Sequence, residues 1–80
     1  MDRDAIRAKV MEILRDVVDD PRLEITDSTT AHDVKRWHSA NHVRLIVALE
    51  ADFDIRFETD EITQPESIGE LVDLIRSKLG

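Results

Sequence analysis

The chain has 80 residues, of which 41% are hydrophobic, with two glycines, two prolines and no cysteine. This length allows one small ordered domain, residues 1–80, and excludes a multi-domain enzyme. So short a chain lacks the walls of a deep water-free cleft, and without cysteine it has no disulfide, thiolate zinc site or thiol nucleophile. We therefore expect a protein that carries or binds something rather than a catalyst.

The net charge of −7 comes from 18 acidic and 11 basic side chains. Acids are concentrated between Glu50 and Glu61, where only Arg56 opposes them. Such a surface repels phosphate backbones and anionic lipids, so we expect neither nucleic acid nor a membrane as a partner, and favour basic protein patches. A solvated acidic face that only aids solubility is the alternative interpretation.

No stretch of the sequence has the character of a membrane span or a secretion signal. The longest apolar run, Leu45–Leu49, is far shorter than a bilayer requires, and the N-terminal residues MDRDAIRAKV include acids where a signal peptide has an apolar core. These features predict a cytoplasmic protein, and the absence of a spare apolar face predicts a monomer.

Apolar side chains recur three and four positions apart between Ile6 and Val17, which predicts an N-terminal helix. Asp2 favours its start through the helix dipole, and Pro21 is expected to end it after residue 20. Residues 22–37 follow as a long connection rich in Thr, Asp and Ser, with a possible single turn at residues 31–35.

A second long helix is predicted over residues 39–53, and its apolar middle is expected to be buried all round. Phe53, Ile55 and Phe57 alternate with charged residues and are expected to form an extended connector that places apolar side chains in the core. Thr59 is the candidate N-cap of a short helix that ends near residue 62.

The last helix is predicted from the periodicity between Ile68 and Leu79 and from the capping box that Ser67 makes with Glu70. The predicted fold class is therefore all-α: a bundle of three long helices plus one short helix, with a long first loop.

The histidines and Ser39 suggest two kinds of site, a metal site and a serine hydrolase site. His32, His38 and His42 lack an evident fourth ligand, so we predict no metal site. A hydrolase pairing of Ser39 with His38 or His42 lacks an orienting acid and an oxyanion hole, so we predict no catalytic residue.

The stretch from Trp37 to Asp54, WHSANHVRLIVALEADFD, resembles the attachment helix of the acyl carrier and peptidyl carrier protein family. In that family an Asp-Ser-Leu motif opens an amphipathic helix, and Ser39 falls at the modified serine. The matching positions after it are Val43, Leu45, Ile46, Val47, Ala48, Leu49, Glu50 and Phe53. Two positions depart: His38 stands in place of Asp, and Ala40 in place of Leu. The resemblance covers nearly the whole chain and implies an acyl-carrier-protein-like bundle.

The resemblance implies that a phosphopantetheinyl transferase places 4'-phosphopantetheine from coenzyme A on Ser39. The arm would then carry acyl or aminoacyl groups as thioesters between loading and processing enzymes, in fatty acid biosynthesis or in polyketide or other natural-product biosynthesis. Trp37 is similar to the residue found there in discrete carriers of specialised acyl pathways. Asp27-Ser28 repeats the Asp-Ser pair, but no amphipathic helix follows it. The alternative function is an unmodified carrier-like helical adaptor that mediates only protein–protein interaction.

Two further sets of residues follow from the resemblance. Partner enzymes are expected to dock on the second helix and the short helix after it, through His38, His42, Arg44, Val47, Glu50, Ala51, Asp60 and Glu61. Part of a bound chain is expected to enter an apolar interior formed by Val43, Ile46, Leu49, Ile62, Ile68 and Leu71, unless this core is fully packed. Arg44 stands where the family commonly has Glu, which predicts a selective partner.

Overall fold

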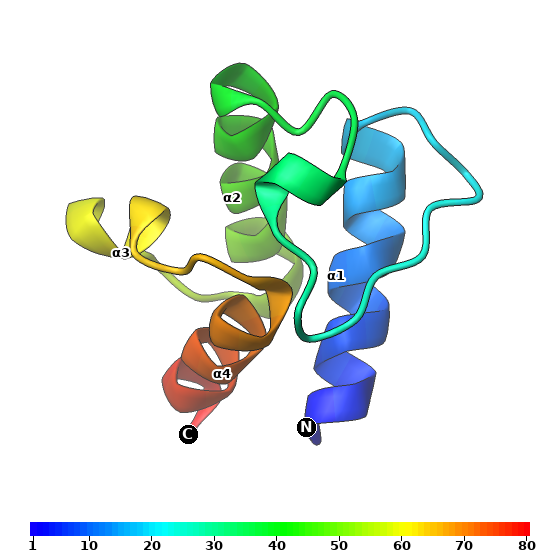
Figure 1. Ribbon diagram of the computed structural model, residues 1–80. Coiled ribbons are helices and arrows are strands. Elements are labelled where there is room, and N and C mark those ends of the chain that lie inside the picture. Colours follow the sequence, from blue (N-terminus) through cyan, green and yellow to red (C-terminus); the bar gives the residue numbers. More distant parts are fainter.

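Helices and their connections make up the whole structure, a computed structural model that describes residues 1–80. The elements are α1 (Arg3–Val17), the 3₁₀ turn η1 (Ala31–Asp33), α2 (Ser39–Phe53), α3 (Thr59–Thr63) and α4 (Ile68–Leu79). The first two helices run in opposite directions, and both termini lie at the same end of the molecule (Figure 1). This confirms the all-α fold class with three long helices and one short one.

Helix α1 begins as predicted and ends earlier. Asp2 is the N-cap, and its Oδ1 accepts a hydrogen bond from the backbone N–H of Ala5 at 2.8 Å. The helix ends at Val17 rather than near Pro21, because Asp19 adopts a left-handed conformation with φ 56° that turns the chain away. The expectation that Pro21 ends the helix is therefore wrong.

The core is entirely apolar and is centred on α1, which packs against both α2 and α4. No polar or charged side chain is buried. Burial of this apolar surface is the main source of stability in a chain without disulfides. The buried hydrophobic residues are Ile6, Val10, Leu14, Val18, Ile25, Val34, Trp37, Leu45, Ile46, Leu49, Phe53, Phe57, Ile68, Leu71, Val72 and Ile75.

Helix α2 buries one face and exposes the other. Val43 and Val47 are 57% and 59% exposed, whereas Leu45 and Leu49 are fully buried. The prediction that the middle of this helix is buried all round is wrong, because no other element covers its outer side. Val43 consequently does not line an apolar interior.

The connector after α2 anchors the chain through its aromatic residues, as predicted. Phe53 and Phe57 are buried and Ile55 is half-buried. The short helix α3 follows, with Glu58 rather than Thr59 as its N-cap. None of the α3 residues is buried, and Ile62 is only packed against the edge of the core.

Helix α4 closes the bundle, and Ser67 is its N-cap: Ser67 Oγ accepts from the Glu70 N–H at 3.3 Å. The long first loop is attached to its start, because the Gly69 N–H donates to the Asp27 carbonyl at 2.8 Å. A Cβ at Gly69 would lie 3.0 Å from that carbonyl oxygen, so glycine permits this close approach.

Charged side chains reinforce the same attachment. Arg3 Nη1 and Arg7 Nη1 lie 3.0 and 3.1 Å from the two carboxylate oxygens of Asp27, and Arg3 Nε lies 2.6 Å from Asp73 Oδ1 on α4. Hydrogen bonds from Arg3 and then Arg7 lower the pKa of Asp27. We call these four residues the Asp27 clasp. None of the helices combines the length and apolar character needed to cross a membrane.

Candidate functional site

Ser39 is the first residue of α2, and its side chain is exposed. The N-cap, His38, is extended (φ −109°, ψ −178°) and makes no side-chain capping bond. The backbone N–H groups of the first turn therefore have no acceptor within the helix and face outward at its positive end. This end of a 15-residue helix is suited to a phosphate.

The segment before Ser39 is fixed by a turn. Arg36 is left-handed with φ 70°, and its carbonyl accepts from Asn41 Nδ2 at 2.5 Å. The next residue, Trp37, is buried, and its N–H donates to the Val34 carbonyl at 3.3 Å. Because Trp37 points inward at this turn, Ser39 is left at the surface.

His42 connects the start of α2 to the end of α3. Its Nδ1 lies 3.1 Å from Trp37 Nε1, and its Nε2 lies 2.6 Å from the Ile62 carbonyl oxygen. The three residues Trp37, His42 and Ile62 form what we call the His42 bridge. This contact could not be predicted from the sequence, because no spacing pattern relates residue 42 to residue 62.

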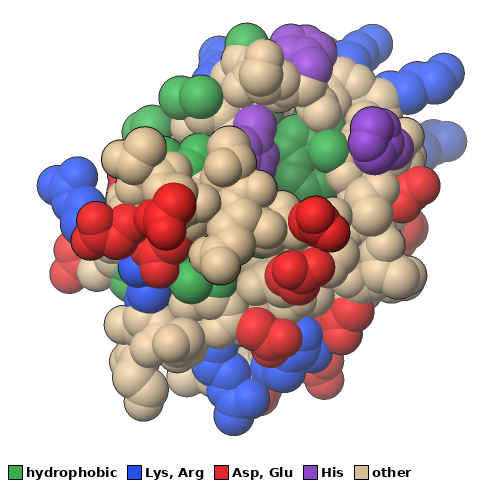
Figure 2. Space-filling view, turned by 60° about the vertical axis from the view of Figure 1, so that its left-hand side comes forward, with side chains coloured by type: hydrophobic (Ala, Val, Ile, Leu, Met, Phe, Trp, Pro, Cys, Tyr) green, Lys and Arg blue, Asp and Glu red, His purple; other side chains and the backbone are tan.

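A shallow groove of ≈ 260 Å³ lies beside Ser39. Behind it is a smaller cavity of ≈ 50 Å³ that reaches Leu71. Figure 2 shows histidine side chains around an exposed apolar patch in the upper part of this face, with acidic side chains below them. The groove is lined by Ala31, Trp37, His38, Ser39, His42, Thr63 and Pro65. An elongated, mostly apolar group attached at Ser39 has a surface to rest on here.

The Asp27-Ser28 pair has a different setting from that of Ser39. Both carboxylate oxygens of Asp27 are bound by arginines in the Asp27 clasp. Ser28 lies in a turn, with its Oγ 3.0 Å from Thr26 Oγ1, and no helix begins there. Ser28 therefore lacks the open helix start that Ser39 has.

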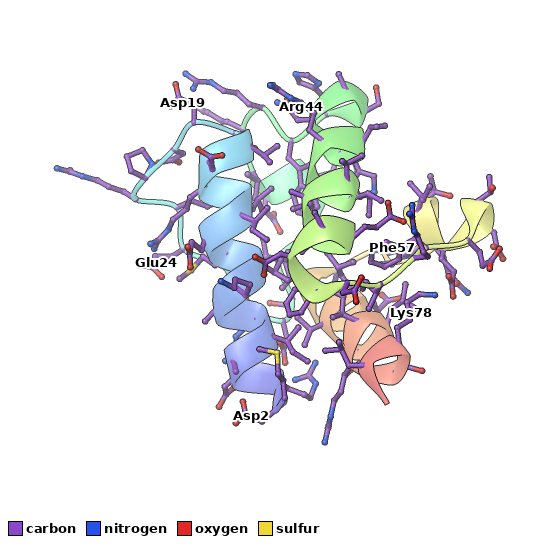
Figure 3. All side chains as sticks on the ribbon, turned by 180° about the vertical axis from the view of Figure 1, so that it is seen from behind. Asp2, Asp19, Glu24, Arg44, Phe57 and Lys78 are labelled. Carbon is purple, nitrogen blue, oxygen red and sulfur yellow. The ribbon has the colours of Figure 1, made fainter.

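The residues predicted to contact partners fall into two groups. Arg44, Val47 and Ala51 are exposed on α2, and Asp60 is exposed on α3. Arg44 lies near the start of α2 and extends from the bundle (Figure 3). A second groove of ≈ 290 Å³ runs past Val47 and Ala51. His38 is exposed next to Ser39.

Glu50, His42 and Glu61 instead use their polar atoms within the molecule. Glu50 Oε2 accepts from the Phe57 N–H at 2.9 Å. Lys78 Nζ lies 2.6 Å from Glu61 Oε1, which also accepts from the Glu58 N–H at 2.8 Å. These bonds, chiefly the one from Lys78, lower the pKa of Glu61.

Lys78 also lies over the Phe57 ring, 5.6 Å from its centroid, where the connector passes α4 (Figure 3). The pair Lys78–Glu61 is thus the second attachment of α3, and we call it the Lys78 bridge. His42 and Glu61 thus hold α3 in place, and both stay partly exposed on the predicted docking surface.

The residues predicted to admit a bound chain are mostly packed. Ile46, Leu49, Ile68 and Leu71 are buried, Ile62 is half-buried, and Val43 lies on the outer face. Of these residues, only Leu71 lines the ≈ 50 Å³ cavity. The histidines do not gather with acids into a group of three or more metal-ligating side chains.

The family model of the phosphopantetheine attachment site matches residues 8–75. The solution NMR structure of a holo acyl carrier protein from Geobacter metallireducens superposes with a TM-score of 0.85 at 35% sequence identity, covering 92% of this chain and 85% of that one. No curated protein gives a significant match. This chain belongs to the acyl carrier protein family, whose members are carriers rather than catalysts.

Its cofactor is covalently bound phosphopantetheine. The structure fits this group, because an exposed serine stands at an open helix start beside a mostly apolar groove. Ser39 and its neighbouring N–H groups would hold the phosphate end, and Trp37 and Pro65 would lie along the arm.

Proposed function

We propose that Ser39 is the attachment serine and that the protein carries acyl or aminoacyl intermediates as thioesters between partner enzymes. The single observation that supports this most is the exposed hydroxyl of Ser39 at the uncapped start of α2. When bound, phosphopantetheine supplies the terminal thiol that holds the cargo. The chain provides the attachment point, the orientation of the arm and the surface that enzymes contact.

The attachment reaction requires a base from outside the chain. Ser39 Oγ has no hydrogen-bond partner in this structure, and a serine hydroxyl is a weak nucleophile without a base. A phosphopantetheinyl transferase must therefore accept the serine proton while Ser39 Oγ bonds to the phosphorus next to the pantetheine. The pyrophosphate bond of coenzyme A breaks in the same step, and adenosine 3',5'-bisphosphate leaves. The N–H groups of the first turn of α2 are placed to stabilise the resulting phosphodiester.

The proposed docking surface is the outer face of α2 with Asp60 of α3. Val43 and Val47 provide its apolar centre, and Arg44 and Ala51 adjoin them on the same helix. Charges around such a centre mainly steer encounter and fix register. Arg44 makes no ion pair in the molecule, so it is free to meet an acidic group on a selective partner.

Intact mass spectrometry tests the proposed function directly. The purified apoprotein is incubated with coenzyme A and a broad-specificity phosphopantetheinyl transferase. We expect a mass increase of one phosphopantetheine. A protein that stays unmodified with this transferase, and also with a panel of other phosphopantetheinyl transferases, would instead be an adaptor of carrier-like fold.

A further inference from the structure

The chemistry of the His42 bridge specifies its protonation state. An indole N–H is only a donor and a carbonyl oxygen is only an acceptor. Nδ1 of His42 must therefore accept from Trp37 at 3.1 Å, and Nε2–H must donate to Ile62 at 2.6 Å. Both bonds are made together only by the neutral ring with its proton on Nε2.

The His42 bridge is one of the few contacts that hold α3 in place. This helix is one turn and a half long, buries none of its residues, and ends at the carbonyl region that His42 binds. Its other attachment, Lys78 to Glu61 at 2.6 Å, lies on the side of α4. On the side of α2, near Ser39, His42 makes the polar contact that holds α3, and the half-buried Ile62 side chain packs against the core.

The same residues separate the groove beside Ser39 from the core. Four residues line both the ≈ 260 Å³ groove and the ≈ 50 Å³ cavity behind it: Ala31, Trp37, His42 and Pro65. The inner cavity has room for only about three or four water molecules. Beyond it, Ile46, Leu49 and Ile68 are buried against one another in the core.

We propose that His42 determines where the cargo lies: it holds α3 against α2, keeps the core closed, and leaves the arm in the groove beside Ser39. This inference rests on the proposed attachment at Ser39, which itself lines the groove. The carrier then suits cargo that needs no apolar shelter, namely short or polar acyl and aminoacyl groups. Loss of the bridge opens the core to longer chains.

The first test needs no cargo. Long-range ¹H–¹⁵N spectra of the apoprotein at pH 7.5 report the tautomer of each histidine. We expect His42 with its proton on Nε2. In Trp37→Phe, which removes the indole donor but leaves the bond to Ile62, we expect the same tautomer with a shifted Nδ1 resonance. A His42 ring already mixed between tautomers in the wild type, or an Nδ1 resonance that Trp37→Phe does not shift, contradicts the bridge.

The second test locates the cargo. Wild type, His42→Ala and the matched exposed control His32→Ala are loaded with acetyl- or octanoyl-phosphopantetheine, and loading is confirmed by mass before any spectrum is recorded. In the wild type and the control we expect shift changes for both cargoes to stay near Ala31, Trp37 and Thr63. In His42→Ala we expect octanoyl to shift the methyl groups of Ile46, Leu49 and Ile68 as well.

The outcomes separate the two proposals. Failure to load Ser39 contradicts the proposed function, and the tautomer experiment still stands by itself. Octanoyl that shifts the core methyl groups equally in wild type and His42→Ala overturns the role of His42. If His42→Ala does not fold, octanoyl-loaded His42→Leu replaces it, because leucine fills space at this position without a donor to the Ile62 carbonyl. The same core methyl groups are the readout, and the wild-type pattern counts against the proposal.

Discussion

Helices α3 and α4 adjoin each other in the chain and are held in different ways. Helix α4 buries Ile68, Leu71, Val72 and Ile75. Helix α3 has no fully buried residue: it is attached through polar bonds at His42 and Lys78 and through the half-buried Ile62 side chain. Apolar burial stabilises the scaffold, and polar bonds position α3 next to Ser39, the proposed attachment residue. A carrier built this way can change what it accepts near Ser39 without losing its fold.

The largest loss of stability is expected when a buried side chain of α4 is truncated. Ile75 is fully buried, and Ile75→Ala should lower the free energy of unfolding by about 2–5 kcal/mol through lost transfer energy and a residual cavity. Urea denaturation followed by circular dichroism measures it. The matched truncation Val47→Ala, on the exposed face of α2, should change stability by no more than about 0.5 kcal/mol. Similar losses in both variants would contradict the burial contrast.

The next largest change in stability is expected from a better N-cap at the start of α2. His38→Asp supplies the missing N-cap acceptor and a negative charge at the positive helix end, so we expect stabilisation of about 0.5–2 kcal/mol. We also expect a higher kcat/KM with a generic phosphopantetheinyl transferase. Thermal melts and transferase kinetics on wild type and variant measure both. If neither quantity rises, His38 makes an interaction that an aspartate cannot replace.

The Asp27 clasp makes the attachment of α4 depend on pH. The pKa of Asp27 is held below its ordinary value of 3.8 by Arg3 and Arg7. A lowered folded-state pKa adds stability that is fully present above the ordinary value and is lost as pH falls through the lowered one. Wild type should therefore exceed Asp27→Asn in stability at pH 7, with the difference shrinking below about pH 4. A difference that is constant with pH in urea titrations would argue against the clasp.

The smallest change in global stability is expected when the Lys78 bridge is removed. Lys78→Met removes the partner of Glu61 while keeping an apolar stem over Phe57. Amide hydrogen exchange in residues 59–63 should accelerate, while exchange in α4 stays near the wild-type rate, because local opening does not require global unfolding. Equal acceleration in both helices would mean that α3 and α4 form one cooperative unit.

Local sequence patterns were enough to predict the all-α fold class and most of the helix positions. Apolar periodicity and the position of Ser39 predicted the second helix with the bounds Ser39–Phe53, and Ser67 predicted the start of the last one. Burial of Val43 and Val47 could not be predicted, because it depends on whether another element covers them. The His42 bridge joins residues 20 positions apart, so no local sequence pattern predicts it. The placement of Glu61 against Lys78 depends in the same way on how α3 meets α4.

The proposed function requires that Ser39 carries the arm, and not Ser28, the serine that follows an aspartate. Peptide mapping by tandem mass spectrometry after treatment with coenzyme A and a transferase tests it, on wild type and on the paired variants Ser39→Ala and Ser28→Ala. The account predicts phosphopantetheine on the Ser39 peptide of the wild type and of Ser28→Ala, and none on Ser39→Ala. Modification found on Ser28, or retained in Ser39→Ala, would contradict it.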